Sequence, residues 1–313
     1  MRYDTIIVGG GPAGLSAALV LGRCRRSVLV IDAGRPRNYA ARNMHNYLSR
    51  DGINPRELLA LGHKELEYYG VHIRRGTVTS ATCEGPAQGF SVEVDGECCA
   101  RSRTLLLATG VVDDLPNIPG LRDFYGLGVH HCPYCDGWEY RDQPIAAYGR
   151  GKPGLGLALS LLTWSPHITI VTDGHPLTKR ELAQAFKLNL SVRPEKIRKL
   201  QSVVGDPRPD EEDHVDKVEF ESGPPLHVRA LFFNTDQAQR SKLPETLGCK
   251  VNEQGGVIRD KRQRTGVKGL YLAGDASRDV QFVIVAAAEG AKAGMAINSD
   301  LQIEDRATFR PKA

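Results

Sequence analysis

The chain contains 313 residues, of which 25% are charged, 41% hydrophobic and 6% aromatic, and its formal net charge is +4. This length predicts two domains, and the mixed composition excludes a fibrous, disordered or membrane-embedded protein. Because the net charge is small and the basic clusters at residues 23–26 and 261–264 are short, we expect no binding to nucleic acid.

Cysteine usage and apolar runs indicate where the protein works. The seven cysteines are an odd number without regular spacing, unlike the disulfide framework of a small secreted protein. The first apolar run follows Met1 so closely that we expect no secretion signal. A later apolar run, at residues 281–297, contains Glu289 and Lys292 and is too polar to cross a bilayer. We therefore expect a cytoplasmic protein with no membrane partner.

A pattern typical of dinucleotide binding stands near the beginning of the chain. A β-branched run at residues 5–8 leads through a glycine-rich turn into an alanine- and leucine-rich run, which predicts strand, turn and helix. The turn contains Gly9, Gly11, Pro12, Ala13 and Gly14. Glycines let a pyrophosphate approach the backbone, and the amides at the helix start meet its charge. A second predicted strand, at residues 27–31, ends at Asp32, where an acid binds a ribose hydroxyl, so we predict a dinucleotide site.

The region that follows predicts one helix and several strands. Leucine periodicity at residues 57–69 is typical of a helix, and residues 71–94 form short strand-like runs separated by glycines. Asp95-Gly96 is a hairpin signal. Residues 104–108 are an apolar strand that ends at Thr109-Gly110, and the prolines after it mark a linker.

After this linker, residues 132–137 read Cys-Pro-Tyr-Cys-Asp-Gly. Cys132 and Cys135 can close and reopen a small disulfide, and Asp136 follows the second sulfur, where it can handle a proton. Alone, a Cys-x-x-Cys pair also fits half of a zinc site, and Cys-Pro-Tyr-Cys is also the motif of glutaredoxins. A metal site would have to use His130 and His131, but adjacent residues do not converge well on one tetrahedral ion, so we predict no metal. For the two histidines themselves, we prefer partly buried or exposed side chains as the interpretation over the alternative of a catalytic base.

The dinucleotide pattern is then repeated. A strand-like run at residues 145–148 is followed by Gly149, Gly151 and Gly154, a helical run, and a further strand that leads to Asp173. Two interpretations remain open: a nicotinamide nucleotide binds here, or the unit keeps a Rossmann-like fold without a working pocket. In the first case Asp173 repels a 2′-phosphate and favours NADH over NADPH.

The last third of the chain predicts further elements of both units. Residues 203–213 form a polar, acidic loop, and residues 215–220 and 226–233 read as a hairpin. A second linker covers residues 234–243. A strand then ends at Gly274-Asp275, and a helix of small residues runs from Gln281 to about residue 298. We expect the charged tail beyond residue 303 to be mobile.

In this order, the motifs resemble those of the low-molecular-weight thioredoxin reductases over almost the whole chain. Four motifs in this order carry the resemblance: the first glycine turn with Asp32, Ala108-Thr109-Gly110, the Cys-x-x-Cys-Asp-Gly stretch, and Gly274-Asp275 with Gln281. Together they exclude a glutaredoxin, which has no nucleotide-binding units. The resemblance implies FAD binding by Gly9, Gly11, Pro12, Ala13, Gly14, Asp32, Asn46, Ala108, Thr109, Gly110, Gly274, Asp275, Gln281 and Phe282.

The resemblance also implies a fold and a mechanism. It implies an α/β protein of two Rossmann-like, three-layer ββα domains: an FAD domain of residues 1–114 and 243–313, and an inserted nicotinamide-type domain of residues 115–242 that carries the cysteines. A homodimer is implied as well. Electrons pass between FAD, the cysteine pair and the disulfide of a thioredoxin-like protein. Cys135 faces the flavin, Cys132 reacts with the partner's sulfur, and Asp136 gives and takes the proton.

The sequence departs from the family pattern where an NADPH-using member binds the 2′-phosphate. A histidine-arginine-arginine run is expected there, but the chain has Thr172-Asp173-Gly174, and residues 232–237 lack the usual Gly-His-x-Pro-Asn. NADPH, NADH, ferredoxin and a dithiol substrate therefore all remain candidate electron donors. Two activities follow as alternatives: reduction of a protein disulfide, or an FAD-dependent oxidation of a small dithiol by oxygen.

Overall fold

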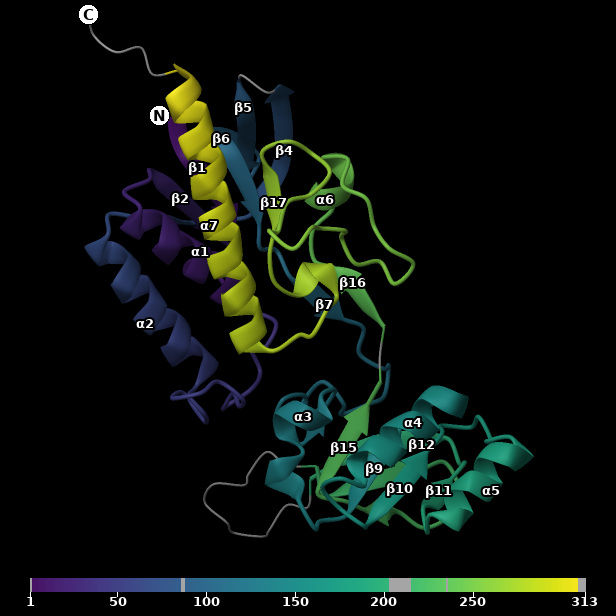
Figure 1. The fold of residues 1–313 in the computed structure, drawn as a ribbon. Helices are drawn as coiled ribbons and strands as arrows, with labels where there is room; N and C mark the ends of the chain where they lie inside the picture. Colours follow the sequence, from purple (N-terminus) through teal and green to yellow (C-terminus); the bar gives the residue numbers. More distant parts are fainter. Residues whose placement is uncertain (1, 86–87, 203–214, 235, 309–313) are drawn as a thin grey trace, which may run out of the picture. The chain divides into compact units, whose positions relative to one another are not determined.

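The computed structural model describes residues 2–85, 88–202, 215–234 and 236–308 (Figure 1). The chain divides into two compact units. Unit 1 comprises Met1–Tyr39, Asn46–Val112 and Gln237–Ala313, and unit 2 comprises Ala40–His45 and Asp113–Asp236. Unit 2 is therefore inserted into unit 1 in the sequence. Residues 40–45 belong to unit 2 although they lie within the first third of the chain, which no sequence pattern indicated.

Unit 1 is organised around a seven-stranded sheet in the order β3-β2-β1-β6-β5-β4, with β17 beside β6. Five strands run parallel: β1 (Arg2–Val8), β2 (Val28–Asp32), β3 (His72–Arg75), β6 (Glu97–Leu107) and β17 (Leu270–Leu272). β4 (Val78–Gly85) and β5 (Gly89–Val94) are antiparallel, and the predicted turn Asp95-Gly96 joins β5 to β6. Residues 6–8 of β1 and 28–31 of β2 are buried on both faces of the sheet, and these parts of the strands are continuously apolar.

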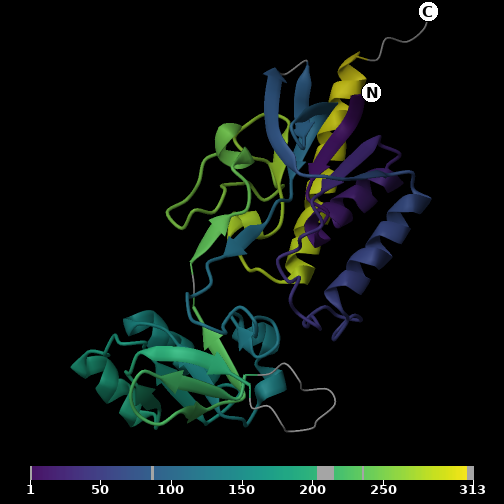
Figure 2. The same cartoon turned by 180° about the vertical axis from the view of Figure 1, so that it is seen from behind.

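Three helices of unit 1 lie side by side in both views: α1 (Pro12–Arg23), α2 (Pro55–Tyr68) and α7 (Val283–Thr308) (Figures 1 and 2). α1 and α2 each carry proline in the first turn, where a missing amide proton leaves no helical bond unmade. Close approach of α7 to α1 depends on small residues, because a Cβ at Gly290 would lie 2.0 Å from the Ala13 carbonyl oxygen. A fourth, one-turn helix is α6 (Leu243–Thr246).

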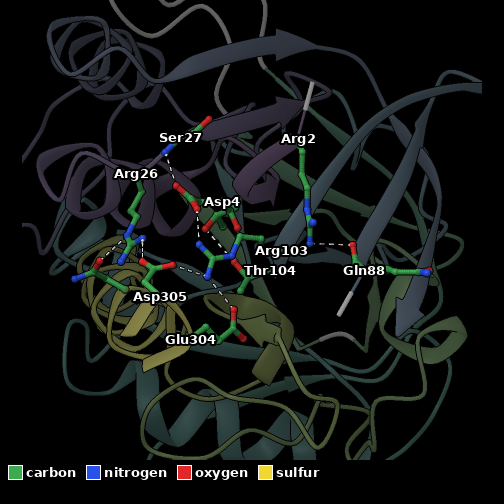
Figure 3. Close-up of polar contacts among 11 residues, drawn as sticks. Arg2, Asp4, Arg26, Ser27, Gln88, Arg103, Thr104, Glu304 and Asp305 are labelled. Carbon is green, nitrogen blue, oxygen red and sulfur yellow. Dashed lines mark hydrogen bonds and ion pairs between the residues drawn. The ribbon is translucent and has the colours of Figure 1, made fainter. Parts of the chain in front are cut away.

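The C-terminal part of α7 is held by ion pairs, which Figure 3 shows. The Arg103 guanidinium lies 3.0 Å from Asp4 on β1, 3.0 Å from Glu304 and 2.8 Å from Asp305. Arg26 adds a second contact to Asp305 at 2.7 Å. Our prediction of a mobile tail beyond residue 303 was therefore wrong for the described residues 304–308, which are helical and tied to the sheet.

Unit 2 contains a parallel five-stranded sheet in the order β11-β10-β9-β15-β8. Its strands are β8 (Val129–His130), β9 (Ile145–Tyr148), β10 (Ile168–Val171), β11 (Ser191–Arg193) and β15 (Ala230–Phe233). A three-stranded antiparallel sheet joins β12 (Ile197–Gln201), β13 (Lys217–Phe220) and β14 (Leu226–His227). A two-stranded sheet of β7 (Val111–Asp113) and β16 (Gln237–Gln239) completes the strands of the described chain.

The predicted hairpin of residues 215–233 needs a correction. β13 and β14 do form a hairpin, but residues 230–233 leave it and join the parallel sheet as β15, because all four of these apolar residues are buried there. The acidic loop predicted at residues 203–213 lies outside the described residues.

The helices of unit 2 are α3 (Pro133–Asp136), α4 (Gly151–Leu161) and α5 (Lys179–Lys187). α5 begins with a capping box in which the Thr178 and Glu181 side chains bond each other's backbone amides. Parallel strands alternating with helices in both units confirm the predicted α/β class with two Rossmann-like units. Among the described residues, no helix is long and apolar enough to cross a membrane.

Candidate redox-active site

The two cysteines of the Cys-x-x-Cys motif form a disulfide in unit 2. Their Cα atoms are 5.2 Å apart. Cys132 is the N-cap of the short helix α3, Pro133 occupies the first helical position, and the Cys132 sulfur accepts a hydrogen bond from the Cys135 amide at 3.1 Å. A hydrogen-bond donor aimed at this sulfur stabilises a thiolate once the bond is reduced.

Aromatic side chains and a glycine shape the surroundings of the disulfide. Tyr134 and Trp138 are 67% and 64% exposed, respectively, and Tyr134 packs edge-on against Trp164 at 5.4 Å between ring centroids. A Cβ at Gly137 would lie 2.5 Å from the Pro133 carbonyl oxygen and 2.7 Å from the Trp164 ring. The glycine of the motif is therefore required by packing, which the sequence pattern did not explain.

Asp136 lies on α3 beside a buried imidazole. Its Oδ1 atom is 3.3 Å from Nδ1 of His130, and its side chain is 24% exposed. Burial raises the pKa of Asp136, but the charge and hydrogen bond of His130, together with His131 and His45, outweigh it, so the pKa lies below its usual range. The carboxylate next to the disulfide is held in its ionised form.

His130 is the buried neighbour of Asp136, and sequence reasoning placed it in a less enclosed position. We interpreted it as a partly buried or exposed side chain, whereas it is only 6% exposed at the end of β8. Its ring lies 5.4 Å from that of Phe232, and its Nε2 atom is 3.1 Å from the Tyr140 hydroxyl. The sequence could have indicated the burial of His130 by its position, since it lies two residues before Cys132 at the end of a buried strand.

His131, by contrast, turns toward another residue: its Nδ1 atom is 3.1 Å from the Tyr125 hydroxyl. The described residues contain no group of three or more histidine, cysteine, aspartate or glutamate side chains that could hold a metal ion.

The predicted flavin-binding turn of unit 1 combines close packing with open space. A Cβ at Gly9 would lie 2.3 Å from the Ala108 carbonyl oxygen, and one at Gly14 would lie 1.9 Å from that of Gly9. A Cβ at Gly11 meets nothing within 4 Å. Gly11 is also the N-cap of α1 and has no side-chain cap, so free amides and room for a phosphate coincide.

The other predicted flavin residues fit the same group. The Asp32 carboxylate, at the end of β2, accepts a hydrogen bond from the Gly10 amide at 3.1 Å. The Thr109 hydroxyl, beyond the end of β6, is buried and has no hydrogen-bond partner among the residues that the structure describes. A buried polar atom of this kind fits a ligand that supplies the missing partner. Gly110 follows it with φ +66°, a conformation that favours glycine.

The C-terminal motif meets the glycine turn. A Cβ at Gly274 would lie 3.0 Å from the Ala13 Cβ, which joins segments far apart in the sequence. Arg37, which the sequence did not single out, bonds Asp275 at 3.0 Å and Gln281 at 2.8 Å. Two other predicted residues have different positions in unit 1: Asn46 lies in a loop, its amide bonded to Asp51 at 2.8 Å, and the half-buried Phe282 precedes α7.

The second glycine turn, predicted for a nicotinamide, is packed at its outer glycines as the first turn is, while a Cβ at Gly151 meets only Oε1 of Glu181, at 3.8 Å. A Cβ at Gly149 would lie 2.6 Å from the Cα of Gly154, so these two glycines serve packing. Gly151 has φ +52° and begins α4, so Pro153 occupies the third helical position. The Asn234 side chain donates to the Pro153 carbonyl at 3.1 Å.

Asp173 also has partners within unit 2. One carboxylate oxygen accepts from the Ile197 amide at 2.9 Å. The other lies 3.5 Å from the Tyr148 hydroxyl and 3.9 Å from Arg150. The predicted nicotinamide residues are thus brought together at the ends of β9 and β10, but the acid is engaged in internal bonds.

Fold and site together define a flavin-dependent disulfide oxidoreductase. The family profile of the pyridine nucleotide-disulphide oxidoreductases matches residues 3–290, so the chain belongs to this family. Its thioredoxin reductase-like members bind FAD, and the chain is an FAD-dependent disulfide oxidoreductase of this type.

Individual relatives support this assignment. The chain is 29% identical over 307 residues to a probable thioredoxin reductase of Arthroderma benhamiae, covering 89% of this chain and 75% of the relative. It is similar to the crystal structure of a putative thioredoxin reductase, TrxB, from Bacillus anthracis, with 34% identity, a TM-score of 0.89 and coverage of 96% and 99%. The crystal structure of HlmI is also similar, with 33% identity, a TM-score of 0.91 and coverage of 98% and 95%.

Proposed function

We propose that this protein passes electrons between FAD, the Cys132–Cys135 pair and the disulfide of a thioredoxin-like protein. The single observation that carries the proposal is the closed Cys132–Cys135 bond, whose first sulfur accepts an amide hydrogen bond and whose neighbour Asp136 is held ionised. A redox pair needs a stabilised thiolate and a nearby proton carrier, and both are present in one loop.

Each residue of the loop has a role in this reaction. The glycine turn of unit 1, together with Asp32 and Thr109, would hold FAD, which when bound would supply or accept two electrons. In this proposal Cys135 would exchange electrons with the flavin, and Cys132 attacks the external disulfide and forms a mixed disulfide. Cys135 then displaces the partner's second sulfur, which restores the Cys132–Cys135 bond. Asp136 transfers the protons that the thiols release and the partner's leaving thiolates take up.

This function is tested with the purified flavoprotein under anaerobic conditions. Oxidised thioredoxin is added together with NADPH, NADH or reduced ferredoxin in parallel, and new thioredoxin thiols are counted. We expect thiols with at least one donor, and none in the Cys132→Ser or Cys135→Ser variant. Failure of every donor to produce thioredoxin thiols would falsify the proposal.

A second candidate function is the oxidation of a small dithiol, with FAD returned to its oxidised form by oxygen. One observation favours it: the Asp173 carboxylate is engaged in internal bonds, and an oxidase of this kind needs no nicotinamide. Oxygen uptake and peroxide release on adding dithiols without any nicotinamide test this candidate. Negligible turnover in that assay excludes it.

Two further properties belong to the same proposal. We expect a homodimer, which light scattering after size-exclusion chromatography detects as twice the chain mass. We also expect the protein to work in the reducing cytoplasm, because Cys24 and Cys83 are exposed thiols that form no disulfide in the structure.

A further inference from the structure

Behind the redox loop, Asp136 contacts His130, which in turn contacts Tyr140; the proposed roles do not use these two buried residues. Asp136 on α3 contacts Nδ1 of His130 at 3.3 Å, and Nε2 of the same imidazole contacts the Tyr140 hydroxyl at 3.1 Å. Tyr140 is buried and belongs to the 3-10 turn Trp138–Tyr140 that follows α3. Its hydroxyl lies 3.0 Å from the Leu127 carbonyl oxygen.

The hydrogen bonds fix how many protons these three groups carry. The Tyr140 hydroxyl has a single proton and donates it to the Leu127 carbonyl, which can only accept. The tyrosine oxygen must therefore accept from His130, so Nε2 carries a hydrogen. Nδ1 of His130 faces a carboxylate oxygen of Asp136. A hydrogen bond between these two atoms requires a proton on one of them. The His130–Asp136 pair consequently holds one proton, either as imidazolium and carboxylate or as imidazole and carboxylic acid.

The charges around the pair favour the carboxylate form of Asp136. His131 and His45 face Asp136 and favour its carboxylate, and the electrostatic field at Tyr140 combines Glu139 with Arg229 and Arg42. On the β15 side, the neighbour of the imidazole is the apolar ring of Phe232. Burial, together with the charges of Asp136 and Glu139, raises the pKa of Tyr140, so its hydroxyl stays protonated and continues to fix Nε2 as the donor.

An ionised carboxyl group cannot by itself donate a proton near neutral pH. With an ordinary pKa of about 3.9, fewer than about one aspartate in a thousand is protonated at pH 7. Imidazole is the side chain that ordinarily holds a proton in this range. Proton donation through Asp136 therefore requires a second group that holds the proton. His130 is in direct contact with the Asp136 carboxylate.

We propose that His130 is a positioning residue that stores the reaction's proton and passes it through Asp136 to the thiolate leaving the external disulfide. The inference rests on the proposed function. The Cys132 thiolate attacks one sulfur of the disulfide, a new S–S bond forms, and the old one breaks. The departing thiolate takes the stored proton. The Cys135 thiol then supplies the proton for the second leaving thiolate as Cys132–Cys135 closes, and water reprotonates the His130–Asp136 pair.

The test compares two disulfides that differ in their need for this proton. Hydroxyethyl disulfide releases a basic alkyl thiolate, whereas dithiobis(nitrobenzoate) releases an acidic aryl thiolate that leaves without protonation. Dithionite-reduced flavoprotein is mixed with each disulfide in a stopped-flow instrument between weakly acidic and weakly basic pH. This assay needs neither thioredoxin nor a physiological donor, so it separates the relay from the identity of the partner.

In His130→Asn we expect alkyl disulfide reduction to slow by about 100-fold at neutral pH, a typical loss when proton transfer is removed. Aryl disulfide reduction stays within about threefold of the unmodified protein, and the alkyl rate recovers as the pH falls. Tyr140→Phe keeps the aromatic ring but releases Nε2, so it gives a smaller loss with the same preference for the aryl disulfide. His167→Asn removes an exposed histidine of unit 2 and serves as the control.

Equal losses on both disulfides at every pH would show a merely structural role for His130 and overturn the relay. An unchanged alkyl rate in both His130→Asn and Tyr140→Phe also overturns it. Thioredoxin thiols could fail to form while His130→Asn still loses alkyl but not aryl disulfide reduction. In that case the assignment of a thioredoxin-like partner fails and the proton relay stands. If the unmodified protein reduces neither disulfide, both proposals fail.

Discussion

Gly137, the last residue of the redox motif, is enclosed by groups that have little freedom to move. A Cβ there would lie 2.5 Å from the Pro133 carbonyl oxygen and 2.7 Å from the Trp164 ring. The first contact is with backbone, so relief requires α3 itself to shift. The geometry of the disulfide loop therefore depends on a residue that takes no part in the chemistry.

We expect Gly137→Ala to destabilise the protein by about 1–3 kcal/mol, as overpacking does, and to slow disulfide reduction. Gly156→Ala is the matched control, because a Cβ at that position of α4 meets nothing within 4 Å. Alanine in a helix interior stabilises by about 0.5–1 kcal/mol relative to glycine. Thermal unfolding of the two variants measures the difference, and equal melting temperatures would contradict the packing argument.

Asp136 gives a pH-dependent prediction. Its folded-state pKa is lowered, so the ionised carboxylate contributes stability above the unfolded value of about 3.9, and this contribution is lost as the pH falls through the folded pKa. Asp136→Asn should therefore lower the free energy of unfolding at neutral pH, and the deficit should shrink on acidification. Urea unfolding followed by tryptophan fluorescence reports on this unit, because both tryptophans, Trp138 and Trp164, lie in unit 2. A deficit that is constant with pH refutes this reasoning.

The sequence predicted the redox site in part. Cys132, Cys135 and Asp136 form a local motif, so their proximity follows from their spacing. The role of His130 depends on its burial beside Phe232 and Tyr140, which the register of β8 and β15 determines. Arg37 was missed for a similar reason, because its partners Asp275 and Gln281 are more than two hundred residues away.

At the scale of elements, local patterns predicted the glycine turns, the first helices and the β5–β6 hairpin. They failed where tertiary partners decide the outcome. The polar end of α7 reads as a tail, but its acidic side chains are neutralised by Arg103 and Arg26 from the other end of the chain (Figure 3). In the same way, residues 230–233 do not continue the local hairpin but form β15 of the buried parallel sheet.

We expect Arg103→Met to release the last turns of α7. The Arg103 side chain is 24% exposed and pairs with three carboxylates, so we expect a loss of about 1–2 kcal/mol together with faster amide exchange in residues 300–308. Arg101→Met is the control on the same strand, since Arg101 is 64% exposed and lies 3.5 Å from Glu84. Hydrogen exchange read by mass spectrometry distinguishes them. Unaltered exchange in Arg103→Met would mean that apolar packing alone holds α7.

Across the whole molecule, the repeated strand–glycine–helix pattern predicted two Rossmann-like units, and the insertion of one into the other followed from the resemblance. The two acids that end corresponding strands have different environments. Asp32 bonds the amide of its own glycine turn, whereas Asp173 bonds Ile197, Tyr148 and Arg150. Spacing alone could not separate these cases, because Asp32 follows Gly14 by 18 residues (32 − 14) and Asp173 follows Gly154 by 19 (173 − 154), and both intervals fit a ribose-binding acid.

The environment of Asp173 leads to a prediction about how electrons enter the protein. A 2′-phosphate at the end of β10 would approach this carboxylate, and Glu181 lies close to the turn, 3.8 Å from a Cβ built at Gly151. Repulsion of about 1.4 kcal/mol reduces affinity tenfold, and like charges near a protein surface reach this magnitude.

We therefore expect subsaturating NADPH to bleach the flavin anaerobically at least about tenfold more slowly than NADH or dithiothreitol. Asp173→Asn should narrow the gap between NADPH and NADH, while Lys187→Gln, at the far end of α5, should leave it unchanged. Bleaching that is fastest with NADPH would show that the carboxylates do not control entry, and stopped-flow absorbance at matched concentrations decides between these outcomes.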